Sequence, residues 1–456
     1  MHISHTRSRQ ARPFLIIAAV LTTSLIFPLS ITGPAAALPR LTQELGAAPL
    51  LPWIVTAYNA AFAAFLLLGG LLADWLGARR IYATGVCLFA AAAGALVLGS
   101  TPEILVAARA LAGVGAAAAT TGGTALLAAA AGPERRGRAF GALGTIMGAG
   151  LAFGPLLSAV VVDHLGWRGV FAVPAALAVL ALGMLAGAGA PKREPRPARP
   201  ALGPALLFTI AFLALTVGIG EIPARGLGDP LVITALVAAL LFGAASAMLG
   251  RAAASPLVPA ALLQSREFLA LVTAAGALMA VFVPLVVFLP LALAERGAGE
   301  AAVATLALTV PSVVLPSVGA RLAKRGSPTR LACVALGIAA LGLVATAISL
   351  GVQGPLAALA PSLLAVGAAV GLTSGVLDGA ALAAVPQRVS ASAAGALNTA
   401  RLASETLALA VAGALILDAA VAPGLALAPV AAGLAALALA ALAGIVALGR
   451  TLELRG

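Results

Sequence analysis

Long uninterrupted runs of apolar residues dominate this sequence and leave few folds open to it. Fourteen such runs, bounded by charges, glycine or proline, follow one another along the 456 residues. A helix that spans a bilayer needs about 20 apolar residues. A membrane β-barrel would show alternating apolar and polar residues instead. The runs therefore predict membrane-spanning helices at 13–37, 50–72, 80–99, 103–127, 137–160, 168–189, 202–220, 230–250, 267–293, 301–322, 329–350, 355–384, 391–418 and 424–449.

The composition excludes an ordinary soluble enzyme. Hydrophobic residues make up 62% of the chain and charged residues 9%, against about 25% charged residues in a typical soluble domain. The net charge of +12 does not indicate a nucleic-acid partner, because the arginines sit in short clusters between apolar runs. That arrangement is typical of the cytoplasmic loops of membrane proteins. The composition predicts an all-α polytopic membrane protein whose surroundings are a lipid bilayer.

The basic residues fall on alternate connecting segments. If the N-terminus is cytoplasmic, 21 of the 27 Lys and Arg residues lie on cytoplasmic segments, four lie outside, and Arg109 and Arg401 lie within spans. This bias predicts a multi-pass protein with both termini in the cytoplasm. The Ala- and Arg-rich usage favours a bacterial plasma (inner) membrane. Treating 202–220 and 230–250 as one re-entrant or peripheral hairpin would leave twelve spans with the same sidedness.

The connection after the second run carries a specific motif. GGLLADWLGARR (69–80) places Gly70, Asp74, Gly77, Arg79 and Arg80 at the spacing G-x-x-x-D-x-x-G-x-[RK]-[RK]. Glycines let the backbone reverse tightly, and an acid there accepts from a helix N-terminus or pairs with an arginine across the bundle. The pattern alone is a weak signal, and its position at the inner end of a predicted span makes it a strong one.

This loop resembles the signature loop of the major facilitator superfamily of secondary transporters. The preceding segment, WIVTAYNAAFAAFLLLGG (53–70), resembles helix two of the fourteen-helix drug:proton antiporter branch. The resemblance implies two pseudo-symmetric six-helix bundles plus an inserted two-helix hairpin, 14 transmembrane helices in all. The expected parts are an N-terminal bundle (1–190), a basic, Pro-rich cytoplasmic linker (191–200), the inserted hairpin (201–250) and a C-terminal bundle (251–456).

Two further segments resemble motifs of the same family. VAARALAGVGAA (106–117) resembles its second motif, which makes Arg109 a candidate for proton coupling. The alternative is an arginine that reaches the outer interface. GAGLAFGPLLSA (148–159) resembles the antiporter motif through Gly150, Gly154 and Pro155, although Ser158 and Ala159 stand where a glycine pair is usual. Generic packing of small residues is the alternative interpretation there.

The resemblance implies a proton-coupling acid in helix one, but Ser30 occupies that position. The remaining acids within spans are Asp378 and Glu405, and Glu405 lies one helical turn beyond Arg401. An acid inside the membrane is a functional candidate. The candidates for proton coupling are therefore Asp378, Glu405, Arg401 and Arg109. A static Arg401–Glu405 or Arg401–Asp378 pair is the structural alternative, and Glu221 is expected in an outer loop.

Neutral polar residues on the predicted pathway helices are weaker candidates for contact with a substrate. A hydroxyl in a helix often bonds a carbonyl of its own helix instead. The residues are Thr32, Asn59, Thr120, Thr145 and Asn398.

The resemblance implies a secondary active transporter, not an enzyme, that exports small amphipathic or drug-like compounds in exchange for protons by alternating access. No nucleotide-binding glycine loop occurs, and the three histidines form no metal site. We expect no cofactor, a proton gradient as energy source, and a monomer. Two alternatives stay open: a proton-coupled importer or facilitator of a metabolite in the same fold, and a non-transporting regulatory or lipid-handling membrane protein.

Overall fold

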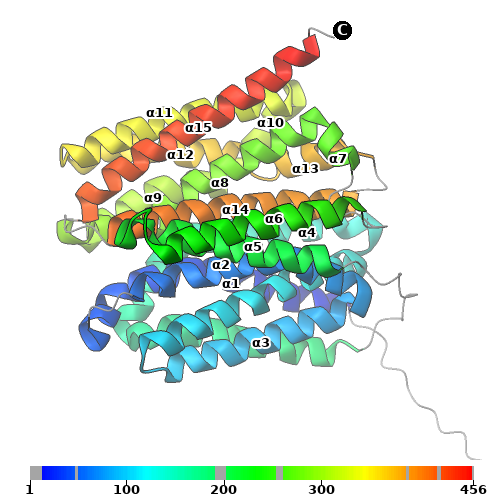
Figure 1. Ribbon diagram of the computed structural model, residues 1–456, viewed down its shortest axis with the longest axis horizontal. Coiled ribbons are helices and arrows are strands. Elements are labelled where there is room, and N and C mark those ends of the chain that lie inside the picture. Colours follow the sequence, from blue (N-terminus) through cyan, green and yellow to red (C-terminus); the bar gives the residue numbers. More distant parts are fainter. Residues whose placement is uncertain are drawn as a thin grey trace, which may run out of the picture.

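The computed structural model describes residues 13–46, 50–189, 202–252, 260–386, 390–417 and 423–453. The regular elements of this part of the chain are helices that lie side by side in one bundle (Figure 1), because helices satisfy their own backbone groups in lipid. They are α1 (Pro13–Leu45), α2 (Leu51–Leu76), α3 (Ala78–Leu98), α4 (Pro102–Gly187), α5 (Leu202–Arg225), α6 (Pro230–Ala252), α7 (Ala260–Gln264), α8 (Arg266–Ala292), the 3-10 helix η1 (Ala294–Arg296), α9 (Ala298–Val314), α10 (Pro316–Arg325), α11 (Pro328–Gly351), α12 (Leu356–Thr373), α13 (Val376–Ala383), α14 (Ser390–Leu417) and α15 (Pro423–Glu453).

Helical hydrogen bonding continues through all of α4, yet this element passes through the bundle three times. Successive residues of α4 contact positions of α1 that advance toward the C-terminal end of α1 and then return toward its N-terminal end. Gly166, with φ of +70°, lies between the second and third passes, where its left-handed backbone lets the chain reverse. The contacts that trace the path are those of Gly113 with Tyr58, Gly123 with Val20, Gly150 with Pro28, Gly154 with Thr32, Val162 with Arg40, and Gly187 with Leu15.

Eleven helices among the described residues are long and apolar enough to cross a membrane. The count rises to twelve if α9 and α10, which meet at a bend of 48°, form one broken span. The protein is therefore a multi-pass membrane protein. This count does not reach the expected fourteen: α14 is not among the eleven, and Phe153–Gly187 counts once although it reverses at Gly166.

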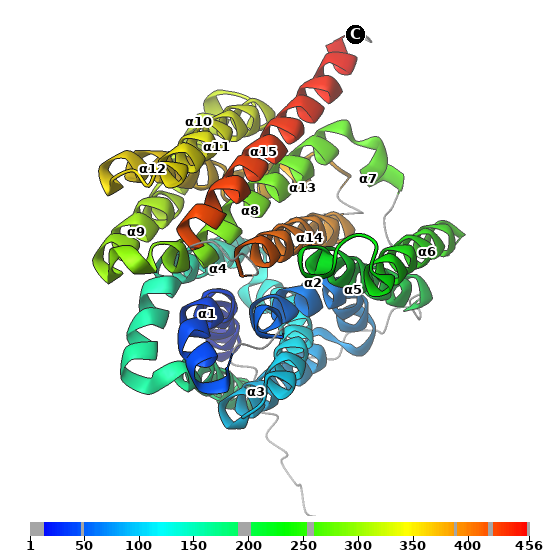
Figure 2. The same ribbon diagram turned by 60° about the vertical axis from the view of Figure 1, so that its left-hand side comes forward.

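The helices form two groups that meet along one interface (Figure 2). We call α1–α4 the N-half and α8–α15 the C-half. α14 packs along α2, and α9 packs beside α4. The Thr406 hydroxyl of α14 donates to the Asn59 carbonyl of α2 at 3.2 Å. Further along the same interface, Gly413 lies against Phe288 and Thr56, so the two halves are closely packed there.

The two ends of the bundle differ in charge. At one end, Arg40 pairs with Asp163 at 3.2 Å and Arg168 pairs with Glu44 at 3.4 Å. We call this the paired end. The other, basic end holds the α2–α3 turn, the end of α6, the start of α8 and the residues around α10. The segregation matches the alternation seen in the sequence. The described basic residues at the basic end include Arg79, Arg80, Arg251, Arg266, Arg321, Lys324, Arg325 and Arg330.

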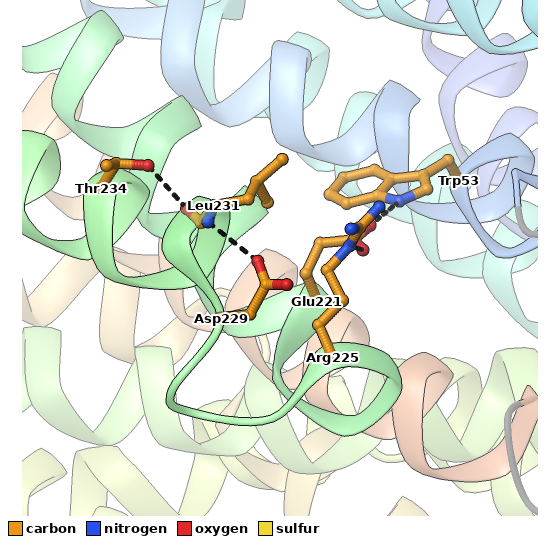
Figure 3. A network of polar contacts seen from close by, with 6 residues as sticks. All are labelled: Trp53, Glu221, Arg225, Asp229, Leu231 and Thr234. Carbon is orange, nitrogen blue, oxygen red and sulfur yellow. Dashed lines mark hydrogen bonds and ion pairs between the residues drawn. The ribbon is translucent and has the colours of Figure 1, made fainter.

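α5 and α6 form an antiparallel hairpin beside α2 and α14 (Figure 2). Polar bonds attach it to α2: Trp53 Nε1 donates to Glu221 at 2.7 Å, and the Thr209 hydroxyl donates to the Ala64 carbonyl at 2.8 Å. Glu221 also accepts from Arg225 at 2.8 Å, which raises the pKa of Arg225 (Figure 3). Glu221 thus lies in the last turn of α5 and not in a loop, because the i,i+4 pair with Arg225 extends the helix.

The described contacts of the hairpin with α14 are apolar, unlike its hydrogen bonds to α2. Phe212 of α5 packs with Ala63 and Ala64 of α2, and Leu402 and Leu407 of α14 border the same cluster. Apolar side chains gain little by leaving lipid for one another. The hairpin is therefore bonded to the N-half and only touches the C-half.

We predict that Trp53→Phe loosens the hairpin. The change keeps an aromatic ring but removes the donor to the Glu221 carboxylate, a bond of the type worth about 1.5–3 kcal/mol. A lower melting temperature in detergent, read by size-exclusion chromatography after heating, is expected. Thr234→Ala is the control, because Thr234 donates to the carbonyls of its own helix α6. A Trp53→Phe melting temperature equal to that of wild type would contradict the anchoring role.

Glycines bring α9 and α12 into backbone contact. A methyl group at Gly367 would collide with the carbonyl of Leu308, whereas one at Gly337 of α11 would meet open space. We predict that Gly367→Ala lowers stability by about 1–3 kcal/mol, the usual cost of overpacking. Gly337→Ala should leave the melting temperature equal or slightly higher. Equal melting temperatures for the two variants would show that α9 and α12 do not pack this closely.

Candidate functional site

Arg109 lies at the centre of the N-half and is 1% exposed. Its Nε donates to the Ile54 carbonyl at 2.7 Å, and its Nη2 donates to the Ser30 carbonyl at 2.9 Å. The Ser30 carbonyl lacks its usual helical donor because Pro34, four residues later, has no N–H. The guanidinium also lies 4.5 Å from the ring centre of Tyr58, in a cation–π contact. The alternative of an arginine at the outer interface is therefore wrong.

Glu405 is buried on the face of α14 that meets the N-half, at 5% exposure. It is close enough to Tyr58 of α2 for electrostatic interaction. Within the described residues, Oε1 of Glu405, the Tyr58 hydroxyl and both side-chain amide atoms of Asn59 have no hydrogen-bond partner. Buried polar groups are normally paired. A set of unpartnered polar atoms therefore lies between the two halves, next to Arg109.

Asp378 and Arg401 form an ion pair inside the C-half, with Arg401 Nη1 at 2.9 and 3.0 Å from the two carboxylate oxygens. Gly375, with φ of +72°, breaks the helix between α12 and α13 and places Asp378 in the first turn of α13. A small pocket between α8, the α12–α13 break and α14 is lined by both charged residues. Of the two static pairs considered as the structural alternative, Arg401 forms the one with Asp378, and no ion pair with Glu405 is present among the described residues. The proton-coupling roles stay predictions.

Exposure falls steadily along one face of α14. Asn398 is exposed, Arg401 is partly exposed, and Glu405 is buried. These positions lie about one helical turn apart on the same face. The face therefore leads from the basic end to the buried acid.

The signature loop forms the expected tight turn between α2 and α3. Gly77 has φ of +99°, a backbone conformation that favours glycine. Arg79 donates to the Leu185 carbonyl at 2.8 Å and so fastens the turn to the end of α4. Asp74 and Arg80 are exposed, and Asp74 makes no ion pair with any described residue. Gly70 lies beside Thr121 of α4.

The segment that resembles the antiporter motif packs against α1. Gly150 lies against Pro28, and Gly154 lies against Thr32, so both glycines permit close helix contact. Pro155 is buried. This geometry fits the motif and generic packing equally, so the antiporter role stays a prediction.

The remaining pathway candidates separate into distinct environments. Thr32 donates to the Pro28 carbonyl of its own helix at 3.0 Å. Thr145 and Asn398 are exposed, whereas the hydroxyl of Thr120 is buried without a partner in the described residues. Asn59 belongs with the unpartnered atoms beside Glu405.

Tyr58 was missed by sequence reasoning. It is fully buried, between Arg109 of its own half and Glu405 of the other. The available signal was its rarity: the chain has only two tyrosines, and this one lies next to Asn59 in the segment that resembles helix two. A polar aromatic residue within an apolar span needs a polar neighbour.

Two helical halves that meet around buried charged side chains thus form the candidate site of this multi-pass membrane protein. The sequence profile of the Major Facilitator Superfamily matches residues 19–409, and the chain belongs to this family. The resemblance of its motifs is thereby confirmed.

Characterised relatives concern antibiotic resistance and export. The chain is 35% identical over 247 residues to a puromycin resistance protein of Streptomyces alboniger, covering 53% of this chain and 48% of that protein. It is 34% identical over 259 residues to a cephamycin export protein of Amycolatopsis lactamdurans, covering 56% and 53%. The match thus spans about half the length of these relatives.

A solved structure supports the fold. A POT family transporter in complex with 5-aminolevulinic acid superposes with a TM-score of 0.71 over 94% of this chain and 95% of that one. At 15% sequence identity this likeness concerns the fold alone.

Proposed function

We propose that this transporter exports small amphipathic or drug-like compounds in exchange for protons, by alternating access of its two halves. The observation that carries the proposal is Glu405, a titratable acid buried between the halves and beside the Tyr58–Arg109 pair. Burying an ionised carboxylate is costly, so a change in the surroundings of Glu405 between conformations would change how tightly it holds a proton. The resistance and export roles of the relatives favour efflux.

The packing fits one stage of such a cycle. Gly413, Phe288 and Thr56 bring the halves together on the paired-end side of Glu405, while the α14 face below it is progressively exposed toward the basic end. The proton on Glu405 would leave through the basic end, after which substrate binds there. Opening of the paired end would then release substrate and let Glu405 take up a new proton.

The topology belongs to the same proposal. We place the basic end in the cytoplasm of a bacterium, since cytoplasmic loops carry the excess of Lys and Arg. Counting α4 as three passes, and α9–α10 and α12–α13 as one broken span each, gives fourteen spans with cytoplasmic termini. The transporter would act as a monomer, without a cofactor, on the energy of a proton gradient.

The direct test uses protein in proteoliposomes with a pH-sensitive dye inside and an imposed proton gradient. Ethidium, tetraphenylphosphonium and puromycin serve as probes. We expect probe-dependent proton movement that Glu405→Gln abolishes and Asp378→Asn reduces. Glu300→Gln is the control, because Glu300 is exposed at the start of α9.

Three other outcomes would each reject part of the proposal. Proton flux that moves together with a probe into the cytoplasm would identify an importer. Probe movement without protons would identify a facilitator. Wild-type protein that moves neither probes nor protons would favour a regulatory or lipid-handling role.

We also predict that Asp74→Asn slows turnover and leaves the affinity for a probe nearly unchanged. Asp74 is unpaired among the described residues in this conformation, so its carboxylate is available to hold the opposite end state. Rates of ethidium transport should fall at least about tenfold, equivalent to 1.4 kcal/mol in the barrier, while ethidium binding stays constant. Unchanged transport would remove the loop from the conformational cycle.

A further inference from the structure

Three side chains from three helices meet where the two halves touch. Arg109 of α4 lies over the ring of Tyr58 of α2, with the guanidinium carbon 4.5 Å from the ring centre. Thr406 of α14 donates to the carbonyl of Asn59 of α2 at 3.2 Å, so α14 and α2 touch beside Glu405 and Tyr58. Glu405 is close enough to Tyr58 for electrostatic interaction. Tyr58 therefore contacts the buried cation of one half and lies near the buried acid of the other.

The polar ends of Tyr58 and Glu405 are both available. The Tyr58 hydroxyl and Glu405 Oε1 are buried and form no hydrogen bond with any described residue. The Ser30 side chain approaches the phenol oxygen, but the contact does not reach hydrogen-bond geometry. A phenol can both donate to a carboxylate and accept from a carboxylic acid. Tyr58 thus suits either protonation state of Glu405.

The charged group nearest to Glu405 on its own helix is Arg401, which interacts with it electrostatically. Arg401, one turn away on α14, is held by both oxygens of Asp378 of α13. The helices α5, α8 and α15 also pack beside α14, and their charged residues lie at their ends. Because Asp378 holds Arg401 within the C-half, the Tyr58–Arg109 pair is the cationic group that the N-half offers near Glu405 among the described residues.

We propose that Tyr58 is a positioning residue that ties the charge of Glu405 to Arg109 across the interface between the halves. When Glu405 gives up its proton, the Tyr58 hydroxyl donates to the carboxylate and directs it toward the guanidinium. The proton itself passes to solvent at the basic end, so charge and atoms balance. The inference deepens the proposed proton coupling and rests on it.

Infrared difference spectroscopy across a pH titration, on the full chain in lipid, tests this inference without a substrate. The C=O stretch of the protonated carboxyl that disappears in Glu405→Gln identifies Glu405. In Tyr58→Phe, which keeps the ring beneath Arg109, we expect the midpoint of this band to move to higher pH by about one unit, because a donor to the charged form is lost. Arg109→Gln should move it in the same direction.

Tyr82→Phe is the matched control. Tyr82 is also a buried tyrosine of the N-half, but its hydroxyl pairs with Thr23 at 3.3 Å, away from α14. Its loss should leave the midpoint of the Glu405 band unchanged.

The remaining outcomes overturn the inference in distinguishable ways. An unchanged midpoint in Tyr58→Phe, or an equal shift in Tyr82→Phe, would reduce Tyr58 to a packing residue. No Glu405 band at any pH would overturn the inference and the choice of carrier. Probe-driven proton movement in proteoliposomes would then still support exchange through another acid, and its absence would reject the proposed function itself.

Discussion

The N-half is organised by one buried cation whose donors reach the backbone of two other helices. Arg109 on α4 bonds carbonyls of α1 and α2 and stacks on Tyr58, so three helices are joined at one point inside the membrane. An unpaired charge there would be expensive. Pro34 contributes by removing the N–H that would otherwise occupy the Ser30 carbonyl. A proline and an arginine separated by some seventy residues thus form a single structural unit.

Each half provides partners for its own arginine, and one buried acid lies at the interface between the halves. In the C-half, the break at Gly375 turns the start of α13 so that Asp378 meets Arg401. In the N-half, Arg109 donates hydrogen bonds to backbone carbonyls and stacks on an aromatic ring. Glu405 lies outside both arrangements, on the surface of α14 that the N-half covers. In the proposed alternating-access cycle, separation of the halves would change the environment of this acid.

Much of this arrangement follows from sequence, but the geometry at the interface does not. Apolar runs and alternate basic loops predicted an all-helical multi-pass chain, and GGLLADWLGARR predicted the turn at Gly77. The sequence also allowed Asp378, at the cytoplasmic end of its predicted span, to face Arg401 on the neighbouring span. Spacing within one helix could not choose between Asp378 and Glu405 as the partner of Arg401. The placement of Tyr58 against Arg109 and near Glu405 depends on the rotation of three helices about their axes, which periodicity in so uniformly apolar a sequence does not specify.

The attachment of the hairpin α5–α6 has a mechanical consequence. Hydrogen bonds of Trp53 and Thr209 fix it to α2, whereas its contact with α14 is made by apolar side chains. Sideways movement of α14 would break no hydrogen bond to the hairpin among the described residues. If the halves move as proposed, the hairpin travels with α2 while α14 slides past its apolar side chains.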